Sequence, residues 1–183
     1  MYAYALNAPL RFVDPSGFSS VDYNNDTATI TLYSGDNFDG AILAQAVAYN
    51  HPAPDANGGF PIGIWPANSW HTYNAGGQDS KFGPYGNLVF NVPGRTGMSI
   101  HSGRKNHLGG PYHNWSGPAY YTEGCIRTTD DFMRKMYETQ FWDFNPVKEL
   151  RVREPALDTS HPSSWAPVPE FWPAGSGDPP TKQ

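Results

Sequence analysis

Glycine and proline are so frequent in this chain that most helical folds are excluded. The 183 residues include 19 Gly and 18 Pro, which recur along the whole length. Glycine loses much backbone entropy in a helix, and proline lacks the amide hydrogen that an interior helical turn requires. Short strands joined by many turns accommodate both residue types. We therefore expect a mainly β protein.

Expected strands lie between these turns. Residues 27–33 alternate and are rich in β-branched side chains, which is typical of a strand. Further strands are expected at residues 88–92, 98–101 and 147–152, and short strands with a bend at Pro66 within residues 62–73. Residues 41–49 fit either a helix or a strand. The polar residues 19–26 are interpreted as a linker.

One principal helix is expected at residues 128–140. Thr128 or Thr129 can cap it, and two aspartates follow in the first turn, where the helix dipole favours acids. The helical spacing of its apolar residues predicts a core-facing stripe of Phe132, Met133, Met136 and Tyr137.

The charge balance argues against two classes of partner. Acidic residues outnumber basic ones by 17 to 12, and the net charge is −5. Nucleic-acid binders normally carry a basic face, and no run of Lys or Arg occurs here. No segment reaches the ~18 consecutive apolar residues that a membrane-spanning helix needs. We expect neither nucleic acid nor a membrane as partner.

Cys125 is the single cysteine, which excludes an intrachain disulfide and a multi-cysteine zinc site. It follows Gly124 and lies in a segment that comes directly before the expected helix, two features that favour a reactive thiolate and nearby main-chain N–H donors. Arg127 would support the thiolate, and Glu123 would oppose it. The structural alternative is a buried cysteine that acts only as a small apolar residue.

A cysteine nucleophile needs a base within reach. His101 ends an apolar segment, so we expect it at a strand end that faces the loop leading to Cys125. His107 and His113 lie within that loop. These three histidines and Cys125 also make up a zinc-type ligand set, but the six-residue spacings between the histidines match no usual zinc pattern. We expect no metal site.

The order of several short motifs resembles the L,D-transpeptidase (YkuD-like) catalytic domain. Residues 100–103 read Ile-His-Ser-Gly, and residues 122–127 read Thr-Glu-Gly-Cys-Ile-Arg. Residues 61–65 (Pro-Ile-Gly-Ile-Trp) and 95–97 (Arg-Thr-Gly) match the branch of this family that serves as type VI secretion effectors. The resemblance extends over about residues 27–152 and implies a curved sheet or sandwich with the helix packed beside Cys125.

The resemblance also implies roles for individual residues. Cys125 would be the nucleophile and His101 the base, oriented by the main-chain carbonyl of Ser102. The N–H groups of Gly124 and Cys125 would form the oxyanion hole. Arg127 would bind a substrate carboxylate, with Tyr121 and Trp115 lining the site. No cofactor is implied.

Two departures from the family pattern affect these expectations. The family has a histidine two places before the cysteine, where this chain has Glu123. The loop between His101 and Cys125 is also longer than usual, which keeps His113 as a reserve candidate for the base.

The implied reaction is attack on stem tetrapeptides of peptidoglycan, with release or exchange of the terminal D-alanine.

The first residues resemble a different family. Residues 1–18 (MYAYALNAPLRFVDPSGF) are similar to the end of the Rhs repeat core, where a toxin domain follows a self-cleavage motif. Carried over, Asp14 belongs to that motif and the cut follows Phe18. The implied organisation is an Rhs end at 1–18, a catalytic toxin domain at 19–153 and a Pro-rich tail at 154–183.

This organisation implies partners and a place of action. We expect an Rhs core, a secretion machine and a cognate immunity protein as partners, and the periplasm of a target bacterium as the site of action. Two other functions stay open. One is a different Cys/His amidase or protease, which a third polar side chain orienting His101 would favour. The other is a non-catalytic wall-binding module that uses Trp65, Trp70 and Trp115 as platforms.

Overall fold

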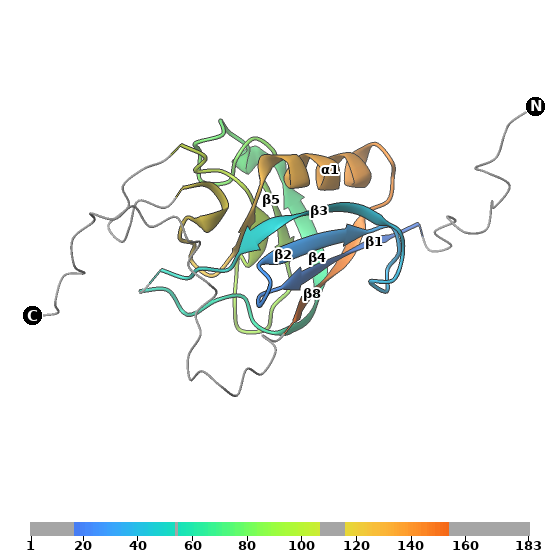
Figure 1. Ribbon diagram of the computed structural model, residues 1–183, viewed down its shortest axis with the longest axis horizontal. Helices are drawn as coiled ribbons and strands as arrows, with labels where there is room; N and C mark the ends of the chain where they lie inside the picture. Colours follow the sequence, from blue (N-terminus) through green and yellow to red (C-terminus); the bar gives the residue numbers. More distant parts are fainter. Residues whose placement is uncertain (1–16, 54, 107–115, 154–183) are drawn as a thin grey trace, which may run out of the picture.

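A computed structural model describes residues 17–53, 55–106 and 116–153 (Figure 1). Its elements are β1 (Ser19–Asn24), β2 (Thr29–Tyr33), β3 (Ile42–Tyr49), β4 (Gly63–His71), the 3-10 turn η2 (Thr72–Asn74), β5 (Asn87–Phe90), β6 (Ser99–His101), the 3-10 turn η3 (Gly117–Ala119), β7 (Ile126–Thr128), α1 (Asp130–Phe141) and β8 (Val147–Arg153). The fold is mainly β with one α-helix, as the sequence predicts.

The strands close into a barrel in the order β1-β2-β3-β7-β6-β5-β4-β8. Neighbours are antiparallel except for β1 with β8 and β6 with β7, which are parallel. Parallel neighbours cannot be joined by a tight hairpin. The parallel pair β6–β7 therefore requires the long connection between His101 and Ile126.

Two long strands of the barrel pair with different neighbours along their lengths. β4 pairs with β8 as far as Pro66 and with β5 from Ala67 onward, with a register shift between Ala67 and Ser69. β3 pairs with β2 along most of its length and with β7 at its last two residues. The predicted bend at Pro66 is thus the point at which one continuous strand changes partners.

The core fills the barrel and extends under the helix. Alternating residues of β1, β2 and β8 point inward, among them Val21, Ile30 and Leu150, which are fully buried. α1 runs alongside β3 (Figure 1). It buries Phe132, Met133 and Met136, while Tyr137 packs edge-on against Trp70. Thr129 caps the helix by accepting a hydrogen bond from the Phe132 amide at 3.2 Å.

The prediction of a linker at residues 19–26 is wrong, because Ser19–Asn24 is strand β1. The polarity of this segment misleads, since its polar side chains are buried with partners. Asp22 forms hydrogen-bonded ion pairs with Arg151 and Arg153 of β8, which lower the pKa of its carboxyl despite burial. β1 is therefore one of the strands that close the barrel.

Residues 41–49, for which the sequence allowed either a helix or a strand, contain strand β3. The helix begins at Asp130, two residues later than expected, because Thr128 ends strand β7. In the described part of the chain, no helix is long and apolar enough to cross a membrane.

Candidate active site

The candidate site is built on the parallel pair β6–β7. Ile100 lies opposite Ile126 in the register, and both are fully buried in the core. Side chains alternate along a strand, so Ser99 and His101 point to the other face, together with Cys125 and Arg127. The Ser99 hydroxyl lies 3.4 Å from the Cys125 sulfur, which agrees with this register.

His101 follows Ser99 on this face at a separation of two residues, or roughly 6.6 Å along the strand. Its side chain is 1% exposed and packs edge-on against the Phe82 ring at 5.0 Å. Nδ1 lies 2.9 Å from the Ser102 carbonyl oxygen. A carbonyl only accepts hydrogen bonds, so Nδ1 carries the proton and Nε2 is the basic nitrogen. This is the contact that the sequence resemblance predicts.

Burial and, after it, the positive charge of Arg127 lower the pKa of His101 to about 3. The imidazole is therefore neutral at physiological pH. Among the described residues, no hydrogen bond joins His101 Nε2 to the Cys125 sulfur, whose other polar neighbour is the Gly97 carbonyl at 3.5 Å. The two groups share one face without forming a resting ion pair.

The loop before Cys125 is fixed by Thr122. Its hydroxyl donates to the Cys125 carbonyl at 2.8 Å and accepts from the Gly124 amide at 3.2 Å. The Gly124 N–H, predicted for the oxyanion hole, is thus directed at Thr122. Gly124 itself has a φ of +110°, and a Cβ there would lie 2.5 Å from Nη2 of Arg95 and 2.7 Å from the Gly58 carbonyl. Only glycine fits this position.

The expectation that Cys125 directly precedes a helix is not met. The three residues of β7 and the cap residue Thr129 separate it from α1. The helix dipole acts mainly within the first turn, so its contribution to thiol acidity is small at this position.

Arg127 is 2% exposed, and its guanidinium donates to main-chain carbonyls. Nη1 donates to the Lys81 and Ser102 carbonyls at 3.1 and 2.9 Å, and Nη2 to the Tyr121 carbonyl at 3.4 Å. Burial lowers the pKa of Arg127 to about 10, which leaves it charged at neutral pH. Binding of a substrate carboxylate by Arg127 stays a prediction, while its contacts favour a role in holding the carbonyl that orients His101.

The loop between β4 and β5 covers this arrangement through close glycine contacts. A Cβ on Gly83 would lie 2.1 Å from the Ser102 hydroxyl, and one on Gly103 would lie 2.2 Å from the Ser80 carbonyl. Both glycines have positive φ angles. The close approach shields His101 from water.

Replacing Gly83 with alanine is expected to destabilise the fold by about 2–4 kcal/mol, because overpacking adds to the strain of a positive φ angle. Gly94→Ala is the matched control, since Gly94 has a φ of +71° but nothing within 4 Å of the added Cβ. Urea unfolding of both variants measures the difference. Equal destabilisation would contradict a close-packed cover over Ser102.

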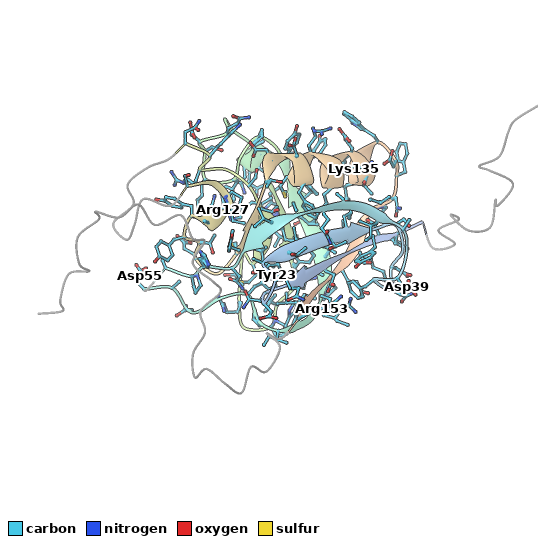
Figure 2. The ribbon with its side chains drawn as sticks, viewed as in Figure 1. Tyr23, Asp39, Asp55, Arg127, Lys135 and Arg153 are labelled. Atoms are coloured by element: carbon cyan, nitrogen blue, oxygen red, sulfur yellow. The ribbon has the colours of Figure 1, made fainter. Side chains whose placement is uncertain are left out.

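A polar pocket of about 520 Å³ adjoins Cys125. We call it the charged pocket, and it is lined by Ala53, Asp55, Ala56, Asn57, Gly94, Arg95, Thr96, Met98 and Glu123. Thr96 and Met98 flank Gly97, whose carbonyl contacts the sulfur. Figure 2 shows Asp55 and Arg127 toward one end of the barrel, opposite the β2–β3 turn that carries Asp39.

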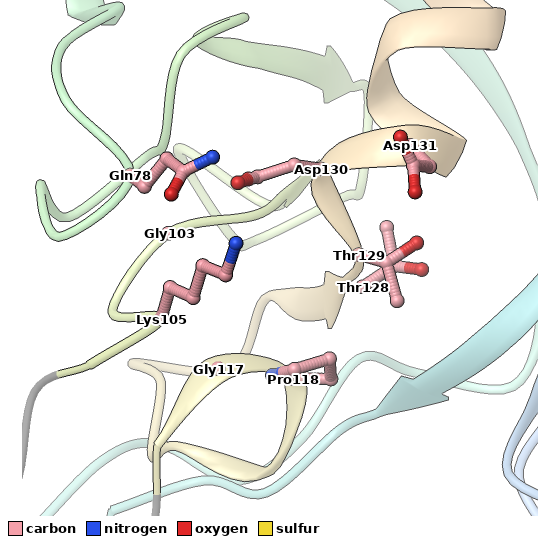
Figure 3. Close-up of a pocket in the computed structure, with 9 residues that line it drawn as sticks. All are labelled: Gln78, Gly103, Lys105, Gly117, Pro118, Thr128, Thr129, Asp130 and Asp131. Carbon is pink, nitrogen blue, oxygen red and sulfur yellow. The ribbon is translucent and has the colours of Figure 1, made fainter.

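A second pocket, of about 250 Å³, lies at the N-terminus of α1 (Figure 3). Lys105 and Asp130 project into it from facing segments. Neither pocket has Cys125 or a histidine in its described lining, but the charged pocket includes Thr96 and Met98, the two neighbours of Gly97, whose carbonyl contacts the Cys125 sulfur.

The remaining predicted site residues are distributed as follows. The Tyr121 carbonyl holds Arg127, and Phe18 immediately precedes β1 with Lys148 near its ring. Asp14, His113 and Trp115 lie outside the described residues. The proposed aromatic platforms Trp65 and Trp70 are partly buried, and their indole N–H groups donate to the Pro61 and Tyr85 carbonyls.

Sequence reasoning missed two residues of the site. Ser99 contacts the sulfur, and period-two alternation back from His101 is the signal that identifies it. Phe82 covers His101 from a distant loop, and no local pattern indicates this. Among the described residues, no group of three His, Cys, Asp or Glu side chains is arranged to hold a metal ion.

No protein-family model matches this chain, and no curated protein matches it. Among solved structures, it is similar to an L,D-transpeptidase (Yku) from Stackebrandtia nassauensis, with a TM-score of 0.46, 16% identity and coverage of 79% of this chain and 60% of that one. It is also similar to Mycobacterium tuberculosis L,D-transpeptidase 1, with a TM-score of 0.45, 16% identity and coverage of 75% and 62%. The chain spans less than two thirds of either structure.

Proposed function

We propose that the chain is a cysteine enzyme that acts on peptidoglycan stem tetrapeptides as an L,D-carboxypeptidase, an L,D-transpeptidase, or both. One observation carries the proposal: His101 ends β6, Cys125 directly precedes its parallel neighbour β7 and contacts Ser99 of β6, and a main-chain carbonyl fixes the histidine tautomer. The choice of substrate rests on the sequence motifs at residues 100–103 and 122–127.

The first chemical step forms a thioester. The Cys125 thiol proton moves to Nε2 of His101, and the sulfur attacks the carbonyl carbon of the amide between the third stem residue and the terminal D-alanine. The C–N bond then breaks, and D-alanine leaves with the proton from Nε2. One nitrogen, Nε2, thus serves first as the base and then as the acid.

The second step regenerates the thiol. Water or an amine attacks the thioester, its proton passes to Nε2, and the C–S bond breaks as the sulfur recovers a proton. Water yields the shortened acid, whereas an amine yields a new amide. Nε2 and the sulfur approach within hydrogen-bonding distance when substrate is bound, as catalytic contacts often tighten only then.

The two alternative functions, another type of Cys/His hydrolase and a non-catalytic wall-binding module, receive less support from this geometry. A polar side chain orienting His101 would favour another type of Cys/His amidase or protease. The group that orients it here is the Ser102 main-chain carbonyl. Of the platforms expected for a passive wall-binding module, Trp65 and Trp70 are partly buried and donate their indole N–H groups to main-chain carbonyls, and Trp115 lies outside the described residues.

The biological setting follows from the Rhs-like segment at residues 1–18. We propose that the catalytic domain at 19–153 is a toxin delivered by a secretion machine into the periplasm of a target bacterium. A cognate immunity protein would cover the cleft at Cys125. Cleavage after Phe18 would release a chain that begins at β1.

The test incubates the protein with disaccharide tetrapeptides, with and without a free D-amino acid, and identifies products by mass spectrometry. We expect loss or exchange of the terminal D-alanine by the wild type and at least about a 10³-fold reduction in Cys125→Ala, because the nucleophile is removed. Arg134→Gln, which changes a half-exposed side chain on the outer face of α1, should retain full activity. Unchanged muropeptides with the folded wild type would overturn the proposed function.

A further inference from the structure

The Ser99 hydroxyl is a buried polar group whose hydrogen bond is directed at the candidate nucleophile. Ser99 begins the three-residue strand β6 and is 0% exposed, and its Oγ donates to the Cys125 sulfur at 3.4 Å. Buried polar groups in folded proteins are nearly always hydrogen-bonded, so this contact fixes the direction of the O–H group. The hydroxyl therefore points at the reacting atom.

The second polar contact of the sulfur shows which group donates. The thiol has one hydrogen, which it donates to the Gly97 carbonyl at 3.5 Å, so the sulfur is the acceptor toward Ser99. The two contacts respond in opposite ways when the thiol ionises. The bond to the Gly97 carbonyl is lost with the proton, whereas the bond from Ser99 becomes charge-assisted and roughly twice as strong. Ser99 thus favours the thiolate.

His101 does not supply such a donor before the reaction starts. Its Nδ1 hydrogen is directed at the Ser102 carbonyl, and its pKa of about 3 leaves Nε2 without a hydrogen at neutral pH. Arg127 contributes its positive charge, but its guanidinium donates to main-chain carbonyls. Among the described residues, the hydrogen bond donated to the sulfur comes from Ser99.

We propose that Ser99 is a catalytic residue whose hydroxyl stabilises the Cys125 thiolate, both before attack and when the sulfur leaves the thioester. The part of this inference that concerns turnover rests on the proposed function. In the first step the thiol proton moves to Nε2 of His101, and the negative sulfur accepts from Ser99. The bond weakens as the C–S bond forms and the sulfur loses its charge.

In the second step the C–S bond breaks and its electron pair returns to the sulfur. The hydrogen bond from Ser99 strengthens again at this point, before the sulfur recovers a proton from Nε2 of His101. Ser99 keeps its own proton throughout, so it differs from a general acid or base. Its contribution is to lower the cost of negative charge on the sulfur in both steps.

The test measures the rate at which iodoacetamide alkylates Cys125 as a function of pH, because the thiolate is the form that reacts. Cys125 is partly exposed and is the single cysteine, so intact mass counts one adduct. In Ser99→Ala, the pH of half-maximal rate should rise by about 1 pH unit, or about a 10-fold smaller thiolate fraction below that midpoint. Ser99→Thr keeps the hydroxyl and should retain the wild-type midpoint.

Thr31→Val is the matched control, because it removes a buried hydroxyl from β2 and should leave the midpoint unchanged. The titratable and charged groups around the sulfur are His101 on β6, Arg127 on β7, Arg95 on the β5–β6 turn, and Glu123 on the preceding loop with its partner Lys81. All of them are present in every variant, so their effects cancel in the comparison.

Turnover provides a second readout. On tetrapeptides, kcat/KM of Ser99→Ala should be about 10-fold below the wild type at pH values under the midpoint and should approach it at higher pH, where both sulfurs are ionised. A purely structural role for Ser99 would lower kcat/KM by the same factor at every pH.

Three outcomes would overturn the inference: an unchanged alkylation midpoint in Ser99→Ala, an equal rise in Ser99→Ala and Ser99→Thr, or a loss of kcat/KM that is independent of pH. The alkylation arm needs no substrate and therefore separates this inference from the proposed function. If the midpoint rises in Ser99→Ala alone but the wild type releases no D-alanine, the proposed function fails and the role of Ser99 at the sulfur stands.

Discussion

His101→Gln is expected to lower kcat on tetrapeptides by about 10²- to 10⁴-fold, the usual contribution of a general acid–base residue. The reason is geometric, because Nε2 of His101 is the basic nitrogen on the face that carries the sulfur. Glutamine preserves polarity and approximate size but cannot exchange a proton. The double variant with Cys125→Ala should be no slower than Cys125→Ala alone, because the two residues act as a unit.

His71→Gln is the matched control for this experiment. His71 lies on β4, where it exchanges hydrogen bonds with Ser69 and Tyr73. Its replacement should leave kcat unchanged. Normal activity in His101→Gln combined with inactivity in His113→Gln would contradict the assignment and transfer the role of base to the loop.

The stability of the protein is expected to fall in acid because of the same histidine. The pKa of His101 is about 3 in the folded state, against an ordinary value of 6.5. As the pH falls below 6.5, the unfolded chain gains a proton that the folded chain does not accept until near pH 3. His101 should therefore cost about 2 kcal/mol of unfolding free energy between pH 7 and pH 5.

Urea unfolding at pH 7, 6 and 5 measures this slope for the wild type and His101→Gln. The charged groups near His101 are Arg127, Lys81 and Arg104, all cationic, so they oppose its protonation together with burial. His51 and Asp22 also have lowered pKa values, but they are present in both proteins and cancel in the comparison. Identical slopes would show that His101 is protonated in the folded state, contrary to this account.

The sequence correctly predicts the strands and the helix that have a clear local pattern of side chains. Residues 27–33 and 147–152 alternate clearly, and each contains most of a strand of the barrel. The helix has both a cap and an apolar stripe. Local patterns do not predict strand β1, because its buried polar residues are stabilised by partners such as Arg151, which lies far along the chain.

The residues of the candidate site fall into the same two groups: those that a local sequence pattern reveals and those that only tertiary packing brings together. Cys125 and His101 can be singled out from motif order and residue chemistry, and the strand pairing then brings them to one face. The burial of Arg127 could not be predicted, because its carbonyl partners come from three separate segments. The contact of Arg95 with Gly124 also depends on tertiary packing and leaves no local pattern.

Intact-mass spectrometry of the protein, acid-quenched during reaction with a tetrapeptide, tests the central claim most directly. The account predicts a covalent adduct equal to the substrate minus D-alanine, located on the peptide that contains Cys125 and absent from Cys125→Ala. Release of D-alanine without any adduct on Cys125, or release that persists in Cys125→Ala, would contradict it.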